Sequence, residues 1–246
     1  MPTPTSPVAV VTGASQGLGR ALAHELASRG WSLVLDARHE RALHEAVRSL
    51  PGGPHPGIAG DVADPAHRRD LVDVAAELGG VTALVNNAST LGTSPLPALA
   101  DLDTATYLRI LQVNLIAPVA LTAALLPQLR VHEGVVLNLS SDASVEAYET
   151  WGGYGSSKAG LDHATRVLAA EEPALRVYAV DPGDMRTQLH QDAFPGEDIS
   201  DRPEPDVAVP ALIQLLEGRL PSGRYRASEL LAGLHDLRDD VMEASA

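Results

Sequence analysis

Two side chains four positions apart, Tyr154 and Lys158, could together transfer a proton near neutral pH. If their segment is helical, this spacing places both on one face of the helix. A free phenol has a pKa of about 10, so acid–base chemistry near neutrality requires a neighbouring positive charge that favours the phenolate. The ammonium group of Lys158 can supply that charge. Tyrosine–lysine pairs at this spacing are also common in structural and surface positions, so other motifs must decide.

A glycine-bearing segment near the N-terminus could hold a phosphate. The segment Thr12-Gly13-Ala14-Ser15-Gln16-Gly17-Leu18-Gly19 follows the β-branched run 8–11 and precedes a stretch with helical spacing, 21–27. Glycine allows backbone conformations closed to other residues, and it lets a pyrophosphate approach the amides at the positive end of a helix. Gly13, Gly17 and Gly19 are therefore candidate cofactor contacts. A tight turn without a ligand would have the same pattern.

Apolar runs and helical segments alternate along the chain, and these elements must position both groups. Strands are predicted at 8–11, 32–35, 57–59, 83–85, 135–139 and 176–180, and helices at about 40–50, 65–78, 101–129 and 154–171. This alternation predicts an α/β fold with a doubly wound parallel sheet covered on both faces. We expect a single domain over residues 8–228 with a substrate loop at 185–206, a flexible tail at 1–7 and a C-terminal tail at 229–246.

Composition argues against several classes of protein. A formal net charge of −14 opposes binding to nucleic acid, which requires clustered lysine and arginine. The sequence contains no run of about 18 uncharged apolar residues, which is the length that a membrane helix requires. The chain has no cysteine, and its first residues have neither the basic start nor the apolar stretch of a secretory signal, so a cytoplasmic location is expected. No metal site is predicted.

The glycine spacing G-x-x-x-G-x-G after Thr12 resembles that of the short-chain dehydrogenase/reductase family. Further motifs of that family follow in the expected order between about residues 8 and 228. They are Asp61-Val62, Asn86-Asn87-Ala88 with Ser89 in place of the usual glycine, Asn114, Ser141 thirteen positions before Tyr154, the Tyr154/Lys158 pair, and Pro182-Gly183 followed by Thr187. The resemblance implies a Rossmann-type fold.

The resemblance also implies a role for each of these residues. Tyr154 would be the general acid/base, Lys158 the ribose contact that modifies its pKa, Ser141 the partner of the substrate oxygen, and Asn114 the holder of a relay water. Cofactor contacts would come from Gly13, Ser15, Gln16, Gly17, Leu18, Gly19, Arg38, Asp61, Val62, Asn87, Ala88, Tyr154, Lys158, Pro182, Gly183 and Thr187. The implied reaction is hydride transfer between a nicotinamide and a carbonyl or alcohol carbon, in either direction.

The cofactor prediction depends on Leu35-Asp36-Ala37-Arg38, which follows the second predicted strand. An acidic residue here can bind the ribose hydroxyls of NAD, whereas arginine can hold the 2′-phosphate of NADP. By resemblance, the acid that selects NAD usually occupies the position of Ala37, and one step along a strand reverses the side-chain direction. We therefore favour NADP with Arg38 as the phosphate contact. NAD stays open, because Gln16 stands where many NADP-using relatives carry arginine.

Two other functions could use the same fold. One is a non-catalytic dinucleotide-binding sensor or scaffold, and the other is an isomerase or dehydratase. The set of Asn114, Ser141, Tyr154 and Lys158 favours an enzyme, because a sensor needs none of that geometry. The expected partner is a small carbonyl or alcohol substrate whose identity the sequence does not indicate. His190 and Phe194 in the substrate loop are expected to lie at the surface of the loop rather than in contact with the substrate. The resemblance makes Tyr148 and Trp151 better candidates for the pocket wall.

The helices predicted at 101–129 and 154–171 are candidates for a symmetric contact between copies of the chain. Small residues in the second helix, including Gly155, Ala159 and Gly160, allow close approach of another helix, although an ordinary buried helix shares this pattern. By resemblance, relatives pair these helices across a two-fold axis, which predicts a homodimer or a homotetramer. Residues 222–226 resemble the start of a final strand, and 230–246 is expected to form a charged helical tail.

Overall fold

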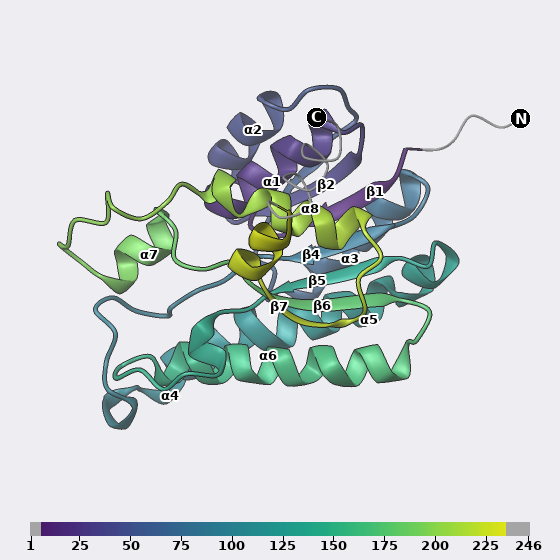
Figure 1. Cartoon of the computed structure of the whole chain (residues 1–246). Coiled ribbons are helices and arrows are strands. Elements are labelled where there is room, and N and C mark those ends of the chain that lie inside the picture. The colour runs from purple at the N-terminus through teal and green to yellow at the C-terminus, as the bar shows by residue number, and fades with distance from the viewer. Residues whose placement is uncertain (1–5, 235–246) are drawn as a thin grey trace, which may run out of the picture.

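A parallel sheet of seven strands forms the centre of the computed structural model, which describes residues 6–234 (Figure 1). The strands lie in the order β3-β2-β1-β4-β5-β6-β7, and each neighbouring pair is parallel. Their bounds are β1 Val8–Val11, β2 Ser32–Ala37, β3 Gly57–Ala59, β4 Ala83–Asn86, β5 Val135–Leu139, β6 Arg176–Asp181 and β7 Gly223–Arg226. The predicted doubly wound, Rossmann-type α/β fold is confirmed.

Helices cover both faces of this sheet (Figure 1). Their bounds are α1 Gly17–Ser28, α2 Glu40–Arg48, α3 Pro65–Glu77, α4 Thr104–Leu111, α5 Ala117–Val131, α6 Gly152–Glu171, α7 Gln188–Ala193 and α8 Val209–Glu217. Short 3-10 turns lie at Leu99–Asp101, Asp142–Ser144 and Pro205–Val207. Local signals explain several helix starts: the side chains of Asp64 and Asp103 accept hydrogen bonds from backbone amides at the beginnings of α3 and α4.

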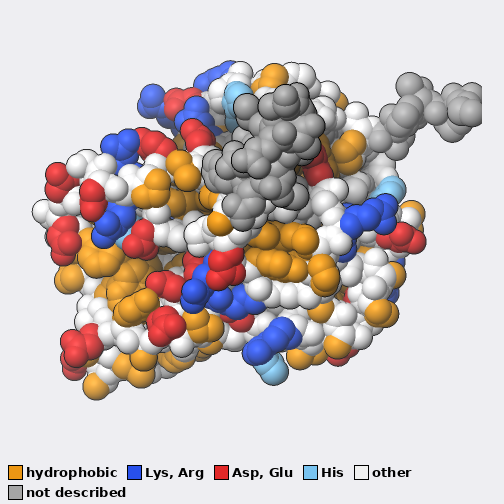
Figure 2. All heavy atoms as spheres, viewed as in Figure 1, with side chains coloured by type: hydrophobic (Ala, Val, Ile, Leu, Met, Phe, Trp, Pro, Cys, Tyr) orange, Lys and Arg blue, Asp and Glu red, His pale blue; other side chains and the backbone are white. Residues whose placement is uncertain are grey.

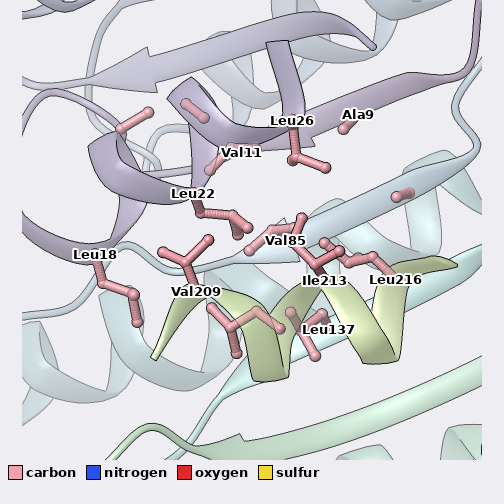
Figure 3. Close-up of a cluster of buried hydrophobic side chains, with 14 of the residues drawn as sticks. Ala9, Val11, Leu18, Leu22, Leu26, Val85, Leu137, Val209, Ile213 and Leu216 are labelled. Carbon is pink, nitrogen blue, oxygen red and sulfur yellow. The ribbon is translucent and has the colours of Figure 1, made fainter. Parts of the chain in front are cut away.

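Each face of the sheet has its own apolar core. On one face, Leu22 and Leu26 of α1 and Ile213 of α8 pack with Val85 and Leu137 of the strands (Figure 3). On the other face, side chains of α3 and α5 pack against the opposite sides of the same strands, namely Leu71, Leu121, Leu125 and Leu129 against Val10, Leu84 and Val136. Burying a leucine or valine side chain contributes about 1.5–3 kcal/mol, so these two layers hold the strand ends in place.

The strand order reverses between β1 and β4. β1 pairs with β2 on one side and with β4 on the other. In open parallel sheets the crevice at the carboxyl ends of the strands, next to such a reversal, is where ligands bind. The segments that leave β1, β2, β4 and β5 therefore meet at one edge of the sheet.

The helix predicted over 101–129 is interrupted. It begins at Thr104, and a π-helical turn, Gln112–Ile116, separates α4 from α5. The whole run Thr104–Val131 is long and apolar enough to cross a membrane on length and composition alone. Its buried side chains pack against the sheet and α3, however, which is the arrangement of a core helix in an α/β domain.

The last third of the chain is more regular than the sequence indicated. The short helix α7 lies within the stretch interpreted as an irregular loop, and Thr187 caps it by accepting a hydrogen bond from the His190 amide. The final strand expected at 222–226 is present as β7. Residues 227–234 are helical, and Leu230 and Leu231 pack against the core. The rest of the predicted tails, residues 1–5 and 235–246, lies outside the described residues.

Candidate active site

A cleft of about 680 Å³ opens at the carboxyl ends of the strands. It brings together most of the residues that the sequence motifs singled out. The cleft is lined by Gly13, Ser15, Gln16, Gly17, Leu18, Arg38, Asp61, Val62, Asn87, Ala88, Tyr154, Lys158, Pro182 and Thr187, along with other residues. Four predicted residues are not among the lining residues: Gly19, Asn114, Ser141 and Gly183.

The glycine turn after β1 has the shape that a bound phosphate requires. Gly13 and Gly17 have φ values of +66° and +54°, a region that favours glycine. A Cβ on Gly13 would lie 2.9 Å from the Cα of Ala88, and a Cβ on Gly19 would lie 2.6 Å from the carbonyl oxygen of Gly13. Side chains would therefore close the cradle in front of the first turn of α1. The residues present fit the pyrophosphate of a dinucleotide at this helix N-terminus.

Partly buried hydrogen bonds fix the turn to β4. The hydroxyl of Thr12, which is 1% exposed, accepts hydrogen bonds from the amides of Asn87 and Ala88, both at 3.0 Å. The Asn87 side-chain amide donates to the carbonyl oxygens of Thr12 at 2.8 Å and Gly13 at 3.1 Å. Asn87 thus stabilises the glycine turn. The motif led us to expect a cofactor contact for Asn87 but did not indicate these hydrogen bonds to the turn.

Asp36 does not lie free at the end of β2. Its side chain accepts a hydrogen bond from the Gly13 amide at 2.8 Å, and its second oxygen lies 2.8 Å from Nε2 of His67. Both Asp36 and His67 are buried. The carboxylate therefore braces the glycine turn from the side of β2. Sequence reasoning missed this function of Asp36 and the role of His67, because no local pattern connects residues so far apart in the chain.

Arg38 lies exposed at the rim of the cleft, one residue beyond β2. Nearby, Asp61 forms an ion pair with Arg109 at 2.6 Å and accepts a hydrogen bond from the Ala63 amide at 2.9 Å. Burial raises the pKa of Asp61, but the Ala63 amide and Arg109, with a smaller effect of Arg38, hold that pKa below its usual range. Within residues 6–234 the guanidinium group of Arg38 forms no ion pair, whereas that of Arg109 is paired with Asp61.

Tyr154 and Lys158 lie one helical turn apart on α6, as their spacing predicted. Both are buried, and Nζ of Lys158 lies 5.5 Å from the centroid of the Tyr154 ring. Nζ also donates a hydrogen bond to the carbonyl oxygen of Leu139 at 2.6 Å. The ammonium group is thus held between the end of β5 and the tyrosine.

Burial has the largest effect on the acid–base properties of this pair. It raises the pKa of Tyr154 to about 12, against an opposing hydrogen bond with Ser89 and together with the negative charges of Asp181 and Asp142. Burial also lowers the pKa of Lys158 to about 8, which Asp162 opposes. The sequence led us to expect that Lys158 favours the phenolate. In the structure desolvation outweighs that effect, and the phenol keeps its proton near neutral pH.

Asn114 and Ser141 are not among the residues that line the cleft, whereas Ser140, the neighbour most easily confused with Ser141, is. Asn114, within the π-helical turn, donates to the Ser157 hydroxyl at 3.1 Å and to the carbonyl oxygen of Thr90 at 2.9 Å. The hydroxyl of Ser89, which replaces the family's glycine, donates to Oδ1 of Asn114 at 3.3 Å. Ser141 caps the turn Asp142–Ser144, and its hydroxyl accepts from the Ala143 amide at 3.2 Å.

The substrate side of the cleft is bordered by aromatic and aliphatic side chains. The Trp151 ring meets Tyr154 edge-on, with centroids 5.7 Å apart, and lies 6.0 Å from Phe194. Phe194 in turn lies 4.9 Å from His190. Apolar side chains gather on the surface below α7 in Figure 2. Trp151 and Tyr148, the expected wall residues, are absent from the lining, and Tyr148 is exposed with its hydroxyl donating to Asp142 at 2.9 Å. From the loop, the lining includes Met185, Leu189 and Asp192.

Comparison with known proteins gives consistent matches. A family model for short chain dehydrogenase matches residues 7–198. Sepiapterin reductase of Xenopus laevis is 31% identical over an alignment that covers 98% of this chain and 92% of that protein. A solved structure from Pseudomonas syringae, described as a short chain dehydrogenase, has a TM-score of 0.84 and 30% identity, covering 92% of this chain and 97% of that one. A Shigella flexneri short chain dehydrogenase complexed with NADP has a TM-score of 0.84 and 26% identity, covering 90% and 97%.

Proposed function

Because the chain belongs to the short chain dehydrogenase family, we propose that it is an NADP-dependent oxidoreductase that reduces a ketone or an aldehyde with Tyr154 as the proton donor. The observation that carries this proposal is the buried Tyr154/Lys158 pair, which opens on the same cleft as the glycine turn. The names of relatives agree with this direction of reaction, since sepiapterin reductase is among them.

The cofactor proposal is NADP, with NAD as the alternative. The nicotinamide of such a cofactor supplies the hydride. The glycine turn would hold the pyrophosphate, and Arg38 would hold the 2′-phosphate with its charged fork. The engagement of Asp36 with Gly13 and His67 supports NADP, because both oxygens of that carboxylate already have a partner in the protein, although Asp36 is among the residues that line the cleft. The NADP complex of the Shigella flexneri relative agrees with this choice.

The proton proposal assigns one task to each side chain. Tyr154 carries its proton at neutral pH and donates it to the oxygen of the carbonyl substrate. Ser141, which lies next to the lining residues, would redirect its hydroxyl from Oδ1 of Asp142 to the same oxygen and stabilise the negative charge that develops there. Lys158 and Asn114 hold the ribose and a relay water, respectively, so that the proton of Tyr154 can be replaced.

A binding protein without turnover is the main alternative. A sensor would need the glycine turn but would gain nothing from burying an ammonium group beside a phenol, which costs free energy. The charged Lys158 in the interior therefore favours an enzyme. An isomerase or a dehydratase on this fold would form product without net change of the cofactor.

The direct test is a spectrophotometric assay of NADPH consumption with a panel of ketones, aldehydes and diketones, with NADH in parallel. We expect carbonyl-dependent oxidation of NADPH and an alcohol product in equal amount by chromatography. Product formation without loss of NADPH would indicate the isomerase or dehydratase instead. Tight cofactor binding with no turnover on the whole panel would indicate the sensor.

We also propose that copies of the chain assemble through α4, α5 and α6, and that the protein works in the cytoplasm without a nucleic acid or membrane partner. Exposed apolar side chains on these helices and on the π-helical turn between α4 and α5 support the assembly: Leu108, Ile116, Val119 and Val167. Light scattering across a dilution series should give the mass of a dimer or a tetramer. A mass of one chain at micromolar concentration would overturn this part of the proposal.

A further inference from the structure

A partly buried ionic cluster lies next to the turn that carries Ser141. Arg224 of β7 donates a hydrogen bond from Nη2 to the carbonyl oxygen of Ser141 at 3.0 Å. From Nε it donates to Oδ2 of Asp162 at 3.0 Å. The side chains of Arg224 and Asp162 are 24% and 9% exposed, so this pair is partly buried rather than fully exposed at the surface. Neither residue lines the cleft.

Asp162 connects this cluster to the helix that carries the reacting pair. It follows Tyr154 and Lys158 on α6 at intervals of four residues, so the three lie along one side of the helix. Its Oδ2 also accepts a hydrogen bond at 2.6 Å from the hydroxyl of Ser144, at the end of the Ser141 turn. Three segments distant in sequence are thus joined at one carboxylate: the Ser141 turn, α6 and β7.

We propose that Arg224 is a positioning residue that holds Ser141 in register with Tyr154. This inference rests on the function proposed above. Arg224 fixes the backbone of Ser141 directly, and it fixes the far end of the same turn through Asp162 and Ser144. A guanidinium group can make both bonds at once from a rigid plane, which the single ammonium group of lysine cannot do in the same geometry. Small displacements of a reacting group are costly, so loosening this turn lowers turnover.

A purely structural role for Arg224 would have a different signature. β7 is the edge strand of the sheet and is already paired along its length with β6. If Arg224 only strengthened that edge, its loss would lower the stability of the protein. Any loss of kcat that followed would then multiply with the loss of kcat caused by a change at Ser141. If it acts through Ser141, its loss has no further effect once the Ser141 hydroxyl is gone.

The test is a cycle of three variants of the full-length protein: Arg224→Met, Ser141→Ala and the double variant. We expect Arg224→Met to lower kcat about tenfold with NADPH binding unchanged, and Ser141→Ala to lower kcat about a hundredfold. The double variant should match Ser141→Ala within about twofold. Multiplied losses, or a wild-type kcat in Arg224→Met, would overturn the inference.

Arg176→Met is the matched control. Arg176 of β6 also donates to backbone carbonyl oxygens, those of Leu216 and Gly218, but its strand position is at the opposite end of the sheet from the cleft. This variant should lower the melting temperature without changing kcat.

Amide hydrogen exchange separates failure of this inference from failure of the proposed function. Arg224→Met should speed exchange in residues 142–146 relative to wild type, whether or not a substrate has been found. Unchanged exchange there would overturn the inference and leave the proposed reductase activity standing. Faster exchange in a protein that reduces no carbonyl would keep the positioning contact and overturn the proposed function.

Discussion

On the cofactor side of the cleft, the glycine turn is held by partly buried hydrogen bonds, whereas the loop on the substrate side is held largely by contacts at the surface. The turn is bonded to Asp36 and Asn87 at 2.8 Å each. The loop that carries α7 depends on ion pairs such as Arg186 with Glu204 and Arg202 with Asp184, whose side chains are 39–63% exposed. Exposed ion pairs contribute little to stability, about 0–1 kcal/mol.

This difference indicates a division of tasks. The cofactor side has its final shape before any ligand binds, because changing it would break partly buried hydrogen bonds. The substrate side can adjust its loop at low cost, as segments with exposed contacts generally can. A variant on one side should therefore change only the function of that side. Lys158 lies between the two sides, so its replacement should show how much free energy of folding its burial costs.

The largest effect is expected from Tyr154→Phe. This change removes the transferable proton but keeps the ring that packs against Trp151, so kcat should fall at least about a hundredfold while the Kd for NADPH stays unchanged. Steady-state kinetics and fluorescence titration measure the two quantities. Tyr107→Phe is the control, since that hydroxyl bonds to Ser156 at 2.9 Å outside the lining of the cleft. Near-normal turnover in Tyr154→Phe would show that another group donates the proton.

Arg38→Ala should affect only the cofactor side. We expect NADPH binding to weaken by about 1.5–3 kcal/mol, the scale of a hydrogen bond to a charged group, with NADH binding almost unchanged. Calorimetric titration of both cofactors measures this. The control is Arg41→Ala, an arginine on α2 that is 92% exposed and pairs with Glu45. Equal weakening of the two cofactors would contradict the assignment of NADP.

Lys158→Met should abolish activity yet stabilise the fold at neutral pH. Burial lowers the pKa of Lys158 from 10.5 to about 8. Such a shift corresponds to roughly 3 kcal/mol, from which the lost hydrogen bond to Leu139 must be subtracted. We expect the free energy of unfolding at pH 7 to rise by about 1–2 kcal/mol in urea titrations.

The pH dependence of the stability of Lys158→Met, relative to wild type, tests whether burial of the charged lysine destabilises the fold. Between pH 8 and 10.5 the unfolded state of the wild type binds more protons at this residue than the folded state does, so wild-type stability rises with pH across that window. The advantage of the variant should therefore shrink between pH 7 and pH 10. A variant less stable than wild type at both values would contradict the prediction.

The smallest effect is expected from Phe194→Ala on the substrate side. Phe194 lies 6.0 Å from the Trp151 ring and helps to hold α7 beside the cleft. Aromatic pairs contribute about 0.5–1.5 kcal/mol, so KM for the carbonyl substrate should rise about three- to tenfold. Binding of NADPH should not change, and Phe194→Leu should give an intermediate KM. A weaker Kd for NADPH in Phe194→Ala would show that the two sides are coupled.

Local patterns in the sequence predicted most of the fold. Apolar runs placed β1 and β5 with their observed bounds, the second with one polar residue, Asn138, because both faces of these strands are buried. The second strand was predicted to end at Leu35, but β2 continues to Ala37. The polar side chain of Asp36 interrupts the apolar pattern, and only its bonds to Gly13 and His67 make it a buried strand residue.

The motifs in the sequence predicted the residues of the candidate site but not the residues that hold them in place. The glycine turn and the Tyr154/Lys158 pair consist of residues close in sequence, so their spacing suggested them, and the order of the further motifs supported the prediction. The partners of these groups come from elsewhere in the chain, as His67 and Arg224 do, and no periodicity connects such positions. The π-helical turn at Asn114 also has no compositional signal, because its residue types are ordinary for a helix.

The π-helical turn holds one residue more than the helix around it needs. A π turn closes its hydrogen bonds over five residues instead of four, so Gln112–Ile116 accommodates one more residue than a regular helix would. Removing one residue there would restore ordinary helical bonding, and the two flanks would keep roughly their present faces because the turn already absorbs the extra residue. Leu121 would stay in the core, whereas Asn114, which lies inside the turn, would lose its alignment with Thr90 and Ser157. The extra residue therefore serves to present Asn114 and not to space the two helices.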